Sequence, residues 1–167
     1  STDKLGGANL HNFHAFTPTV ANIRPTSRGE ISISSSDTKV NPKIKMNYLS
    51  TDEDRKVAAD GIKLIRKIVM ETNEFKKYEP EEFRPGSHLN DKEEIVKACS
   101  HYAQTIFHPV GTCKMGNDES AVVSDKLKVH GINKLRVIDA SIMPNITSGN
   151  TNAPTIMIAE KGADMIL

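Results

Sequence analysis

The sequence predicts an α+β fold in which an antiparallel or mixed sheet packs with a few helices. Residues 30–35 and 43–49 alternate between apolar and polar side chains, as half-buried antiparallel strands do. Residues 54–71 and the segment from 90 onward instead repeat their apolar residues at helical spacing. These two periodicities, together with the pattern at the C-terminal end, predict the mixed fold.

The C-terminal segment predicts a strand, an irregular loop and a helix. Within residues 135–138, Leu135, Val137 and Ile138 are apolar, which suits a short buried strand. Asn152 precedes Ala153 and Pro154, and proline is tolerated in the first turn of a helix because no intrahelical donor is lost there. From Thr155 onward the expected helix has an apolar stripe of Ile156, Ile158, Ala159, Gly162, Ala163 and Ile166.

The start of that helix has two possible interpretations. A helix that begins beneath a loop of small polar residues presents unpaired N–H groups and a positive dipole potential. Such an end can hold a phosphate, a carboxylate or an electron-rich ring. Alternatively, the segment is a plain strand–loop–helix corner, and Asn152 only caps the helix.

Further extended segments are expected along the chain. Residues 1–10 have no periodic pattern, and residues 11–23 predict two short extended pieces in which Pro18 is easiest to place on an edge strand. Residues 34–42 predict a polar loop between the two main strands. The side chains expected to point inward from those strands are Ile31, Ile33, Ile44, Met46 and Tyr48.

Two helices are expected between these segments and the C-terminal part. Ser50 and Glu53 match a capping box for the first helix, and Asn90 is the expected cap of the second. Arg66 is expected on the solvated face of the first helix. The first helix is expected to bury Val57, Ala58, Ile62, Ile65, Ile68 and Val69, and the second Ile95, Val96, Cys99, Tyr102 and Ala103.

Composition excludes several classes of function. The chain has 167 residues, with Lys+Arg 22 against Asp+Glu 21 and a net charge of +1, and it has no basic stripe, so nucleic acid is not an expected partner. No apolar run is long enough for a transmembrane segment. The two cysteines form no disulfide framework, and His11 and His14 lack neighbouring metal ligands, so no metal site is expected. We expect a cytoplasmic protein, or one attached peripherally at the inner membrane.

Four stretches resemble a single enzyme family. They are RPTSRG at 24–29, HPVGTCKMG at 108–116, RVIDASIMP at 136–144 and SGNTNAPTIMIAEKGAD at 148–164. In these stretches the chain resembles the C-terminal part of the glucose–methanol–choline (GMC) flavoprotein oxidoreductases, and in particular their choline dehydrogenase-like members. The resemblance implies an FAD-dependent enzyme that oxidises a small alcohol.

The same resemblance implies a division of the chain. Residues 1–134 correspond to the substrate-binding domain, and residues 135–167 to a strand, loop and helix that return to the FAD-binding domain. No G-x-G-x-x-G motif follows a strand, and Gly6-Gly7 stands alone. The cradle for the ADP half of FAD is therefore expected in an N-terminal half outside this chain, which would be its partner in the same polypeptide.

His108 is the candidate catalytic base. Oxidation of an alcohol by a flavin needs a base for the hydroxyl proton, and a histidine ordinarily titrates near neutral pH. Pro109 is expected to stiffen the backbone, and the apolar Ile106, Phe107 and Val110 to keep water scarce. By resemblance, this histidine lies at the reactive face of the flavin. On the residues alone, a hydrogen-bonded core histidine is the alternative.

Asn152 is the second candidate catalytic residue. Its amide can donate a hydrogen bond to the substrate oxygen as that atom gains negative charge. Members of the family carry His or Asn at this position, and an Asn cannot share proton transfer, so His108 is expected to act alone.

Four residues are assigned to cofactor contacts by resemblance, in addition to Asn152. Asp139 and Ala140 correspond to contacts with the ribityl and pyrophosphate region of FAD. Ala153 and Pro154, with Asn152, correspond to the helix start that faces the isoalloxazine ring, where the helix dipole favours negative charge.

Two other functions compete with this interpretation. Cys113 follows His108 closely enough to suggest a Cys–His hydrolase, but side chains alternate along an extended segment, so the two should point in opposite directions. The chain could also be a non-catalytic binding or scaffold module with the same fold. Within the leading hypothesis, the sequence does not distinguish choline from other alcohols, or oxygen from another electron acceptor.

Overall fold

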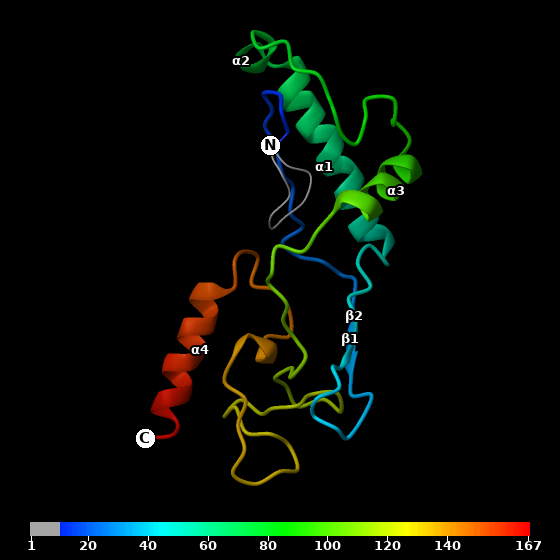
Figure 1. The fold of residues 1–167 in the computed structure, drawn as a ribbon. Coiled ribbons are helices and arrows are strands. Elements are labelled where there is room, and N and C mark those ends of the chain that lie inside the picture. Colours follow the sequence, from blue (N-terminus) through cyan, green and yellow to red (C-terminus); the bar gives the residue numbers. More distant parts are fainter. Residues whose placement is uncertain (1–10) are drawn as a thin grey trace. The chain divides into compact units, whose positions relative to one another are not determined.

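The computed structural model of the protein describes residues 11–167, and its elements are drawn in Figure 1. The chain forms two compact units, each built from two separate stretches of sequence. The described part of the first unit runs to Asn22 and resumes at Tyr48–Ile106, whereas the second comprises Ile23–Asn47 and Phe107–Leu167. The chain therefore leaves the first unit, forms a hairpin in the second, and returns.

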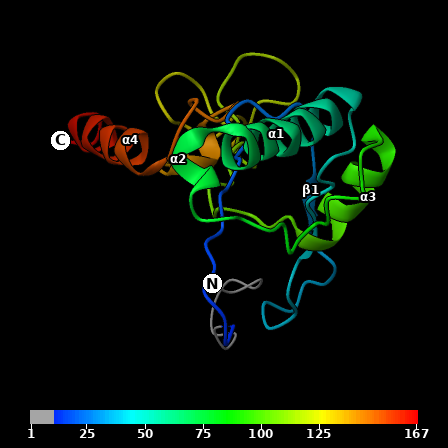
Figure 2. The same ribbon diagram turned by 90° about the horizontal axis from the view of Figure 1, so that it is seen from above.

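The first unit is helical. It contains α1 (Asp52–Glu71), the short α2 (Asn73–Lys76) and α3 (Lys92–Tyr102). α1 runs as one uninterrupted helix in both views (Figures 1 and 2). These helices confirm the helical part of the predicted fold class.

Both expected helix caps are wrong by one residue. Thr51, not Ser50, caps α1, and its side chain accepts a hydrogen bond from the backbone N–H of Asp54 at 3.3 Å. Asp91, not Asn90, caps α3, and its carboxylate accepts from Glu93 N at 2.8 Å and Glu94 N at 3.4 Å. In each case two adjacent residues have side chains that can cap a helix, so the local sequence alone does not determine which of them is the N-cap.

The core of the first unit lies between α1 and α3. Ala59 of α1 and Ile95 and Ala98 of α3 are buried, and Ile95 is fully buried. The expected stripes are partly wrong, because Ile68 of α1 is 44% exposed and Tyr102 of α3 is 45% exposed. Two of these three buried residues, Ala59 and Ala98, are small, so small side chains form much of the contact between α1 and α3.

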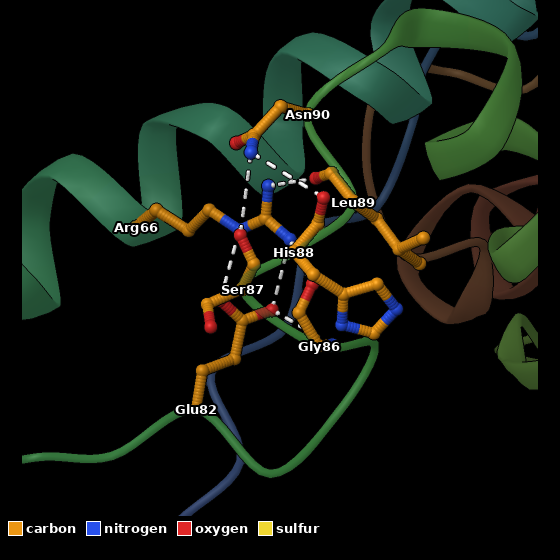
Figure 3. A network of polar contacts seen from close by, with 7 residues as sticks. All are labelled: Arg66, Glu82, Gly86, Ser87, His88, Leu89 and Asn90. Atoms are coloured by element: carbon orange, nitrogen blue, oxygen red, sulfur yellow. Dashed lines mark hydrogen bonds and ion pairs between the residues drawn. The ribbon is translucent and has the colours of Figure 1, made fainter.

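Arg66 is not solvated as expected, because residues 82–90 fold over it (Figure 3). Its guanidinium donates to both carboxylate oxygens of Glu82, at 2.9 and 3.0 Å, and the two side chains are only 17% and 13% exposed. It also donates to the backbone oxygens of Leu89 at 2.6 Å and Gly86 at 3.0 Å. The bidentate ion pair thus attaches a long connection to the outer face of α1.

The sheet in the second unit is smaller than expected. Strands β1 (Glu30–Ser32) and β2 (Lys43–Lys45) pair antiparallel, with Ile31 opposite Ile44. The expected inward side chains are exposed instead, with Ile31 at 49%, Ile33 at 86% and Ile44 at 61%. A two-stranded ribbon has no second layer to cover either face, so alternation did not lead to burial within this chain. Met46 is 41% exposed. Tyr48, which belongs to the first unit, is 56% exposed.

Two further strand predictions are wrong. Residues 11–23 contain no strand, and residues 135–138 contain only an isolated bridge from Arg136 to Lys128. Short bridges also join Val123 to Met115 and to Val129. The fold of the described residues is therefore helices with one small antiparallel sheet, and much of the second unit is irregular.

The core of the second unit is formed mainly by loops. It comprises the buried residues Val123, Leu127, Ile142, Met143 and Ile158. Ile142 belongs to the one-turn 3-10 helix η1 (Ala140–Ile142), and Ile158 to the C-terminal helix α4 (Asn152–Asp164).

No helix in the described part of the chain is long and apolar enough to cross a membrane.

α4 packs through a narrower stripe than expected. Ile158 and Gly162 are buried, whereas Ile156 is 54% and Ile166 is 65% exposed. A Cβ atom at Gly162 would lie 2.4 Å from Cγ2 of Ile138, so only glycine permits this approach. The contact fixes α4 against the segment that leads into η1.

Candidate functional site

The candidate site lies in the second unit, at the start of α4. His108 lies outside any helix or strand and directly precedes Pro109, which disfavours a helical backbone, and its imidazole is half-buried. Its Nδ1 atom lies 3.0 Å from the hydroxyl oxygen of Thr151 and 3.4 Å from the Thr151 backbone nitrogen. The residue after Thr151 is Asn152. The structure therefore brings together two motifs that are far apart in sequence.

Thr151 occupies the N-cap position that was expected for Asn152. Asn152 is instead the first residue of α4 and has an exposed side chain. Thr151 is only 7% exposed, and its side chain makes no capping hydrogen bond to the helix. Its hydroxyl lies against His108 instead. Sequence analysis missed Thr151, although a cap-forming residue directly before Asn-Ala-Pro is a signal for this position.

The first turn of α4 is suited to a ligand with negative charge. The Thr151 side chain makes no hydrogen bond to the backbone of this turn, and Pro154 has no backbone N–H. Among described residues 11–167, no acceptor contacts the N–H groups of Asn152 and Ala153. These groups lie at the positive end of the helix dipole, close to the residue that contacts His108.

Asp139 and Ala140 lie at the start of η1. The Asp139 carboxylate caps this turn, since its Oδ1 accepts from the Ser141 backbone N at 2.8 Å and from the Ser141 hydroxyl at 2.5 Å. The Asp139 side chain is exposed, and Ala140 is half-buried. No hydrogen bond between described residues joins Asp139 to His108. Asp139 and His108 therefore belong to neighbouring segments but form no direct pair.

Backbone hydrogen bonds connect the segment after His108 to η1. Cys113 N donates to Ser141 O at 3.0 Å, and Met115 N donates to Ile142 O at 2.8 Å. This pairing places the HPVGTCKMG and RVIDASIMP motifs side by side. His108 and Asp139 therefore belong to two segments that are hydrogen-bonded to each other.

The RPTSRG loop is attached to the loop before α4. Arg24 Nε donates to the Ser148 hydroxyl at 2.7 Å, and Arg28 Nη2 donates to the Asn145 side-chain oxygen at 2.5 Å. Both loops line a shallow cavity of about 320 Å³. The two arginines thus hold the chain that leads into Thr151.

Two sequence-based arguments about the surroundings of His108 are not fully met within this chain. Phe107 is 70% exposed and Ile106 is 47% exposed, whereas Val110 is half-buried against the core, so only one of the three expected apolar residues is sheltered from water. Gly111 has φ +88°, and a turn follows it, so the segment to Cys113 is not uniformly extended and simple alternation does not apply. Cys113 is a half-buried free thiol, and no hydrogen bond between described residues joins it to His108.

The described residues contain no group of three or more His, Cys, Asp or Glu side chains that could hold a metal ion.

Comparison with known sequences identifies the family. The sequence model described as GMC oxidoreductase matches residues 25–159, which is most of the chain. The chain therefore belongs to the GMC oxidoreductases, a family of FAD-dependent enzymes that act on alcohols. The predicted resemblance to the C-terminal part of these enzymes is confirmed.

Among individual proteins, the chain is similar to choline dehydrogenases. The chain is 47% identical over 160 residues to the oxygen-dependent choline dehydrogenase of Proteus mirabilis, covering 96% of this chain and 29% of that protein. It is 45% identical over 160 residues to the enzyme of the same name from Acinetobacter baumannii, again covering 96% and 29%. The chain thus spans less than a third of the length of these relatives.

Solved structures show the same fold. Formate oxidase of Aspergillus oryzae, studied for modification of its FAD, matches with a TM-score of 0.79 and 33% identity over 92% of this chain and 28% of that one. Pyridoxine 4-oxidase from Mesorbium loti matches with a TM-score of 0.78 and 35% identity over 85% and 28% of the respective chains.

Proposed function

We propose that the complete protein oxidises a primary alcohol with FAD as the hydride acceptor, and that this chain supplies its catalytic base. The observation that carries the proposal is the 3.0 Å contact between His108 Nδ1 and the Thr151 hydroxyl, which holds the imidazole beside the start of α4. Membership of the GMC family and the similarity to choline dehydrogenases support the same conclusion. Because the chain covers only 29% of these relatives, the activity belongs to the complete polypeptide.

His108 is proposed to accept the hydroxyl proton of the substrate. Its Nδ1 contacts Thr151, so Nε2 is the ring nitrogen available to the substrate. A base in hydrogen-bond reach of the hydroxyl lets the carbon release a hydride as the proton leaves. When bound, FAD supplies the acceptor for that hydride.

Asn152 is proposed to stabilise the substrate oxygen. Its exposed side chain belongs to the residue directly after Thr151, on the first turn of α4. An amide N–H can donate to an oxygen that gains negative charge during proton transfer. Asn152 does not titrate, so His108 performs the proton transfer alone.

The residues assigned to FAD contacts are compatible with such a group. The unpaired N–H groups of Asn152 and Ala153 can donate to an electron-rich ring or an anion. Ser141 contacts only Oδ1 of Asp139, and no donor among the described residues contacts Oδ2, which is therefore available to a ribityl hydroxyl. We assign Asp139, Ala140, Asn152, Ala153 and Pro154 to the cofactor side of the site.

The proposal includes the arrangement of the complete protein. Residues 1–134 would belong to a substrate-binding domain, and residues 135–167 would complete the FAD-binding domain together with an N-terminal half of the same polypeptide. The exposed apolar ribbon, with Ile33 at 86% and Ile44 at 61%, is compatible with further covering in the complete protein.

The test is anaerobic titration of the complete, FAD-loaded polypeptide with a panel of alcohols. Choline is the first substrate to use, because the curated relatives named above are choline dehydrogenases. We expect choline or another primary alcohol to bleach the oxidised flavin absorbance, whereas the isolated 167-residue chain should retain no stoichiometric FAD. A complete polypeptide that binds FAD but is bleached by no alcohol would contradict the proposal and favour a non-catalytic module.

A further inference from the structure

The two contacts between His108 and Thr151 require different proton positions on the imidazole. A backbone N–H always donates, so the 3.4 Å contact from Thr151 N requires a lone pair at Nδ1. The Thr151 hydroxyl, at 3.0 Å, can either donate to Nδ1 or accept a proton that Nδ1 carries. In a neutral imidazole, the state of Nδ1 decides the state of Nε2.

Only one of the two tautomers can act as the proposed base. If Nδ1 accepts hydrogen bonds, the neutral ring carries its proton on Nε2, and that atom cannot take a proton from the substrate. If Nδ1–H donates to the Thr151 hydroxyl, Nε2 has a free lone pair. The hydroxyl contact is the shorter one, and 3.4 Å is long for a hydrogen bond from a backbone N–H.

The side chain of Thr151 is well placed to select a tautomer. Thr151 is 7% exposed, and its backbone oxygen accepts from the Thr155 hydroxyl at 2.6 Å and from Thr155 N at 3.0 Å. These bonds fix Thr151 to the first turn of α4. Because threonine is β-branched, its χ1 angle has few options, so the hydroxyl direction is restricted as well.

We infer that Thr151 is a positioning residue whose hydroxyl accepts the Nδ1–H of His108 and thereby holds the tautomer with a free Nε2. A threonine at an N-cap usually bonds to its own helix, but α4 has no such bond. The hydroxyl is instead directed at the imidazole. The inference rests on the proposed function for its catalytic consequence, but the tautomer itself can be measured independently.

The decisive experiment combines nitrogen NMR with kinetics on the complete polypeptide. The protein is labelled with ¹⁵N-histidine, the His108 signals are assigned with the His108→Gln variant, and spectra are recorded with and without FAD. Thr151→Val removes the hydroxyl while keeping the shape, and Thr151→Ser keeps the hydroxyl. Wild type and Thr151→Ser should show the Nδ1–H tautomer, and Thr151→Val should lose it.

The kinetic result expected of Thr151→Val is a fall in kcat of about 10- to 100-fold, the range typical when a partner that orients a metal-ligating histidine is removed. KM should change less than about threefold, and Thr151→Ser should restore most of kcat, because truncation to serine keeps the acceptor.

Two outcomes would overturn the inference. A wild-type protein with the proton on Nε2 would show that the backbone N–H contact governs the ring, and this result needs no variant. A Thr151→Val variant with wild-type tautomer and kcat would show that the hydroxyl has no such role. If the tautomer shifts as expected but His108 variants still reduce flavin normally, the tautomer selection stands and the proposed base fails.

Discussion

At the start of α4, the N-cap position and the exposed amide that were expected at one residue belong to two adjacent residues. Asn152 was expected either to cap the helix or to contact a ligand, or to do both. The structure gives the cap position to the buried Thr151 and leaves the Asn152 side chain exposed. An amide that does not cap its own helix can donate hydrogen bonds to a substrate, which is the role proposed for Asn152.

Asp118 provides a prediction at the residue scale. Its carboxylate accepts from the Ser120 hydroxyl at 2.6 Å, from Lys114 Nζ at 2.9 Å and from Ser120 N at 3.0 Å. These contacts, with the Ser120 hydroxyl first, hold the pKa of Asp118 well below its usual range. A carboxyl with a lowered folded-state pKa stabilises the fold above its unfolded pKa, and this contribution is lost as pH falls through the folded pKa.

We therefore expect Asp118 to stay ionised when the pH is lowered through the ordinary aspartate value of about 3.9. A carboxyl ¹³C titration followed by NMR measures this directly. In Ser120→Ala the midpoint should move up toward the ordinary value, because the largest cause of the shift is removed. An ordinary midpoint in the wild-type protein would show that the turn does not form as described.

At the scale of elements, the ion pair between α1 and the connection after α2 is the clearest feature that sequence patterns did not predict. A helical wheel assigns Arg66 to the solvated face because it considers α1 alone. The connection that contains Glu82 folds over that face and leaves the two side chains 17% and 13% exposed. A tertiary contact of this kind depends on where a loop goes, which periodicity does not specify.

Removing one partner of this pair should destabilise the first unit. Arg66→Met leaves Glu82 without its bidentate partner and the oxygens of Gly86 and Leu89 without a donor. We expect the free energy of unfolding to fall by about 3 kcal/mol, as measured by urea unfolding of the chain. Lys67→Met, at an exposed neighbouring position, is the matched control and should change it by less than about 0.5 kcal/mol.

Arg66→Lys separates charge from geometry. A lysine keeps the positive charge but cannot form the bidentate contact. The free energy of unfolding of Arg66→Lys should therefore lie between those of the wild type and Arg66→Met. If Arg66→Met and Arg66→Lys both unfold like the wild type and the control, residues 82–90 are not held on α1 in solution.

The helices and the antiparallel pairing of β1 with β2 were largely predictable from sequence, whereas the burial of these strands and the expected strand at 135–138 were not. α1 and α3 have strong local signals, and the caps Thr51 and Asp91 lie one residue from those expected. The predicted strand at 135–138 has the right composition, but only Arg136 forms a bridge, to Lys128. Strands depend on partners distant in sequence, so composition alone cannot decide whether pairing occurs.

The same reasoning applies to the candidate site. The motifs containing His108 and Asn152 were recognisable, because long stretches resemble one family. Their contact through Thr151 was not, because it joins residues that lie 43 positions apart in sequence and depends on the tertiary fold. Likewise, Phe107 is 70% exposed and has a φ of +65°, and a sequence pattern reveals neither property.

At the scale of the whole molecule, the units do not follow the order of the sequence. The ribbon of β1 and β2 belongs with the C-terminal stretch from Phe107 onward, although α1 and α3 lie between them in sequence. A division at residue 134 concerns the complete enzyme and stays a prediction. The chain covers 29% of its choline dehydrogenase relatives, so the proposed catalytic activity can only be tested in the complete polypeptide.

The most direct test of the central claim is the rate of flavin reduction in a His108→Ala variant of the complete enzyme, measured by anaerobic stopped-flow. His101→Ala is the matched control, because His101 is an exposed histidine on α3. If His108 is the base, its variant should reduce flavin at least about 100-fold more slowly with the alcohol substrate, while the control stays within about twofold of wild type. A His108→Ala enzyme that reduces flavin at the wild-type rate would contradict the claim.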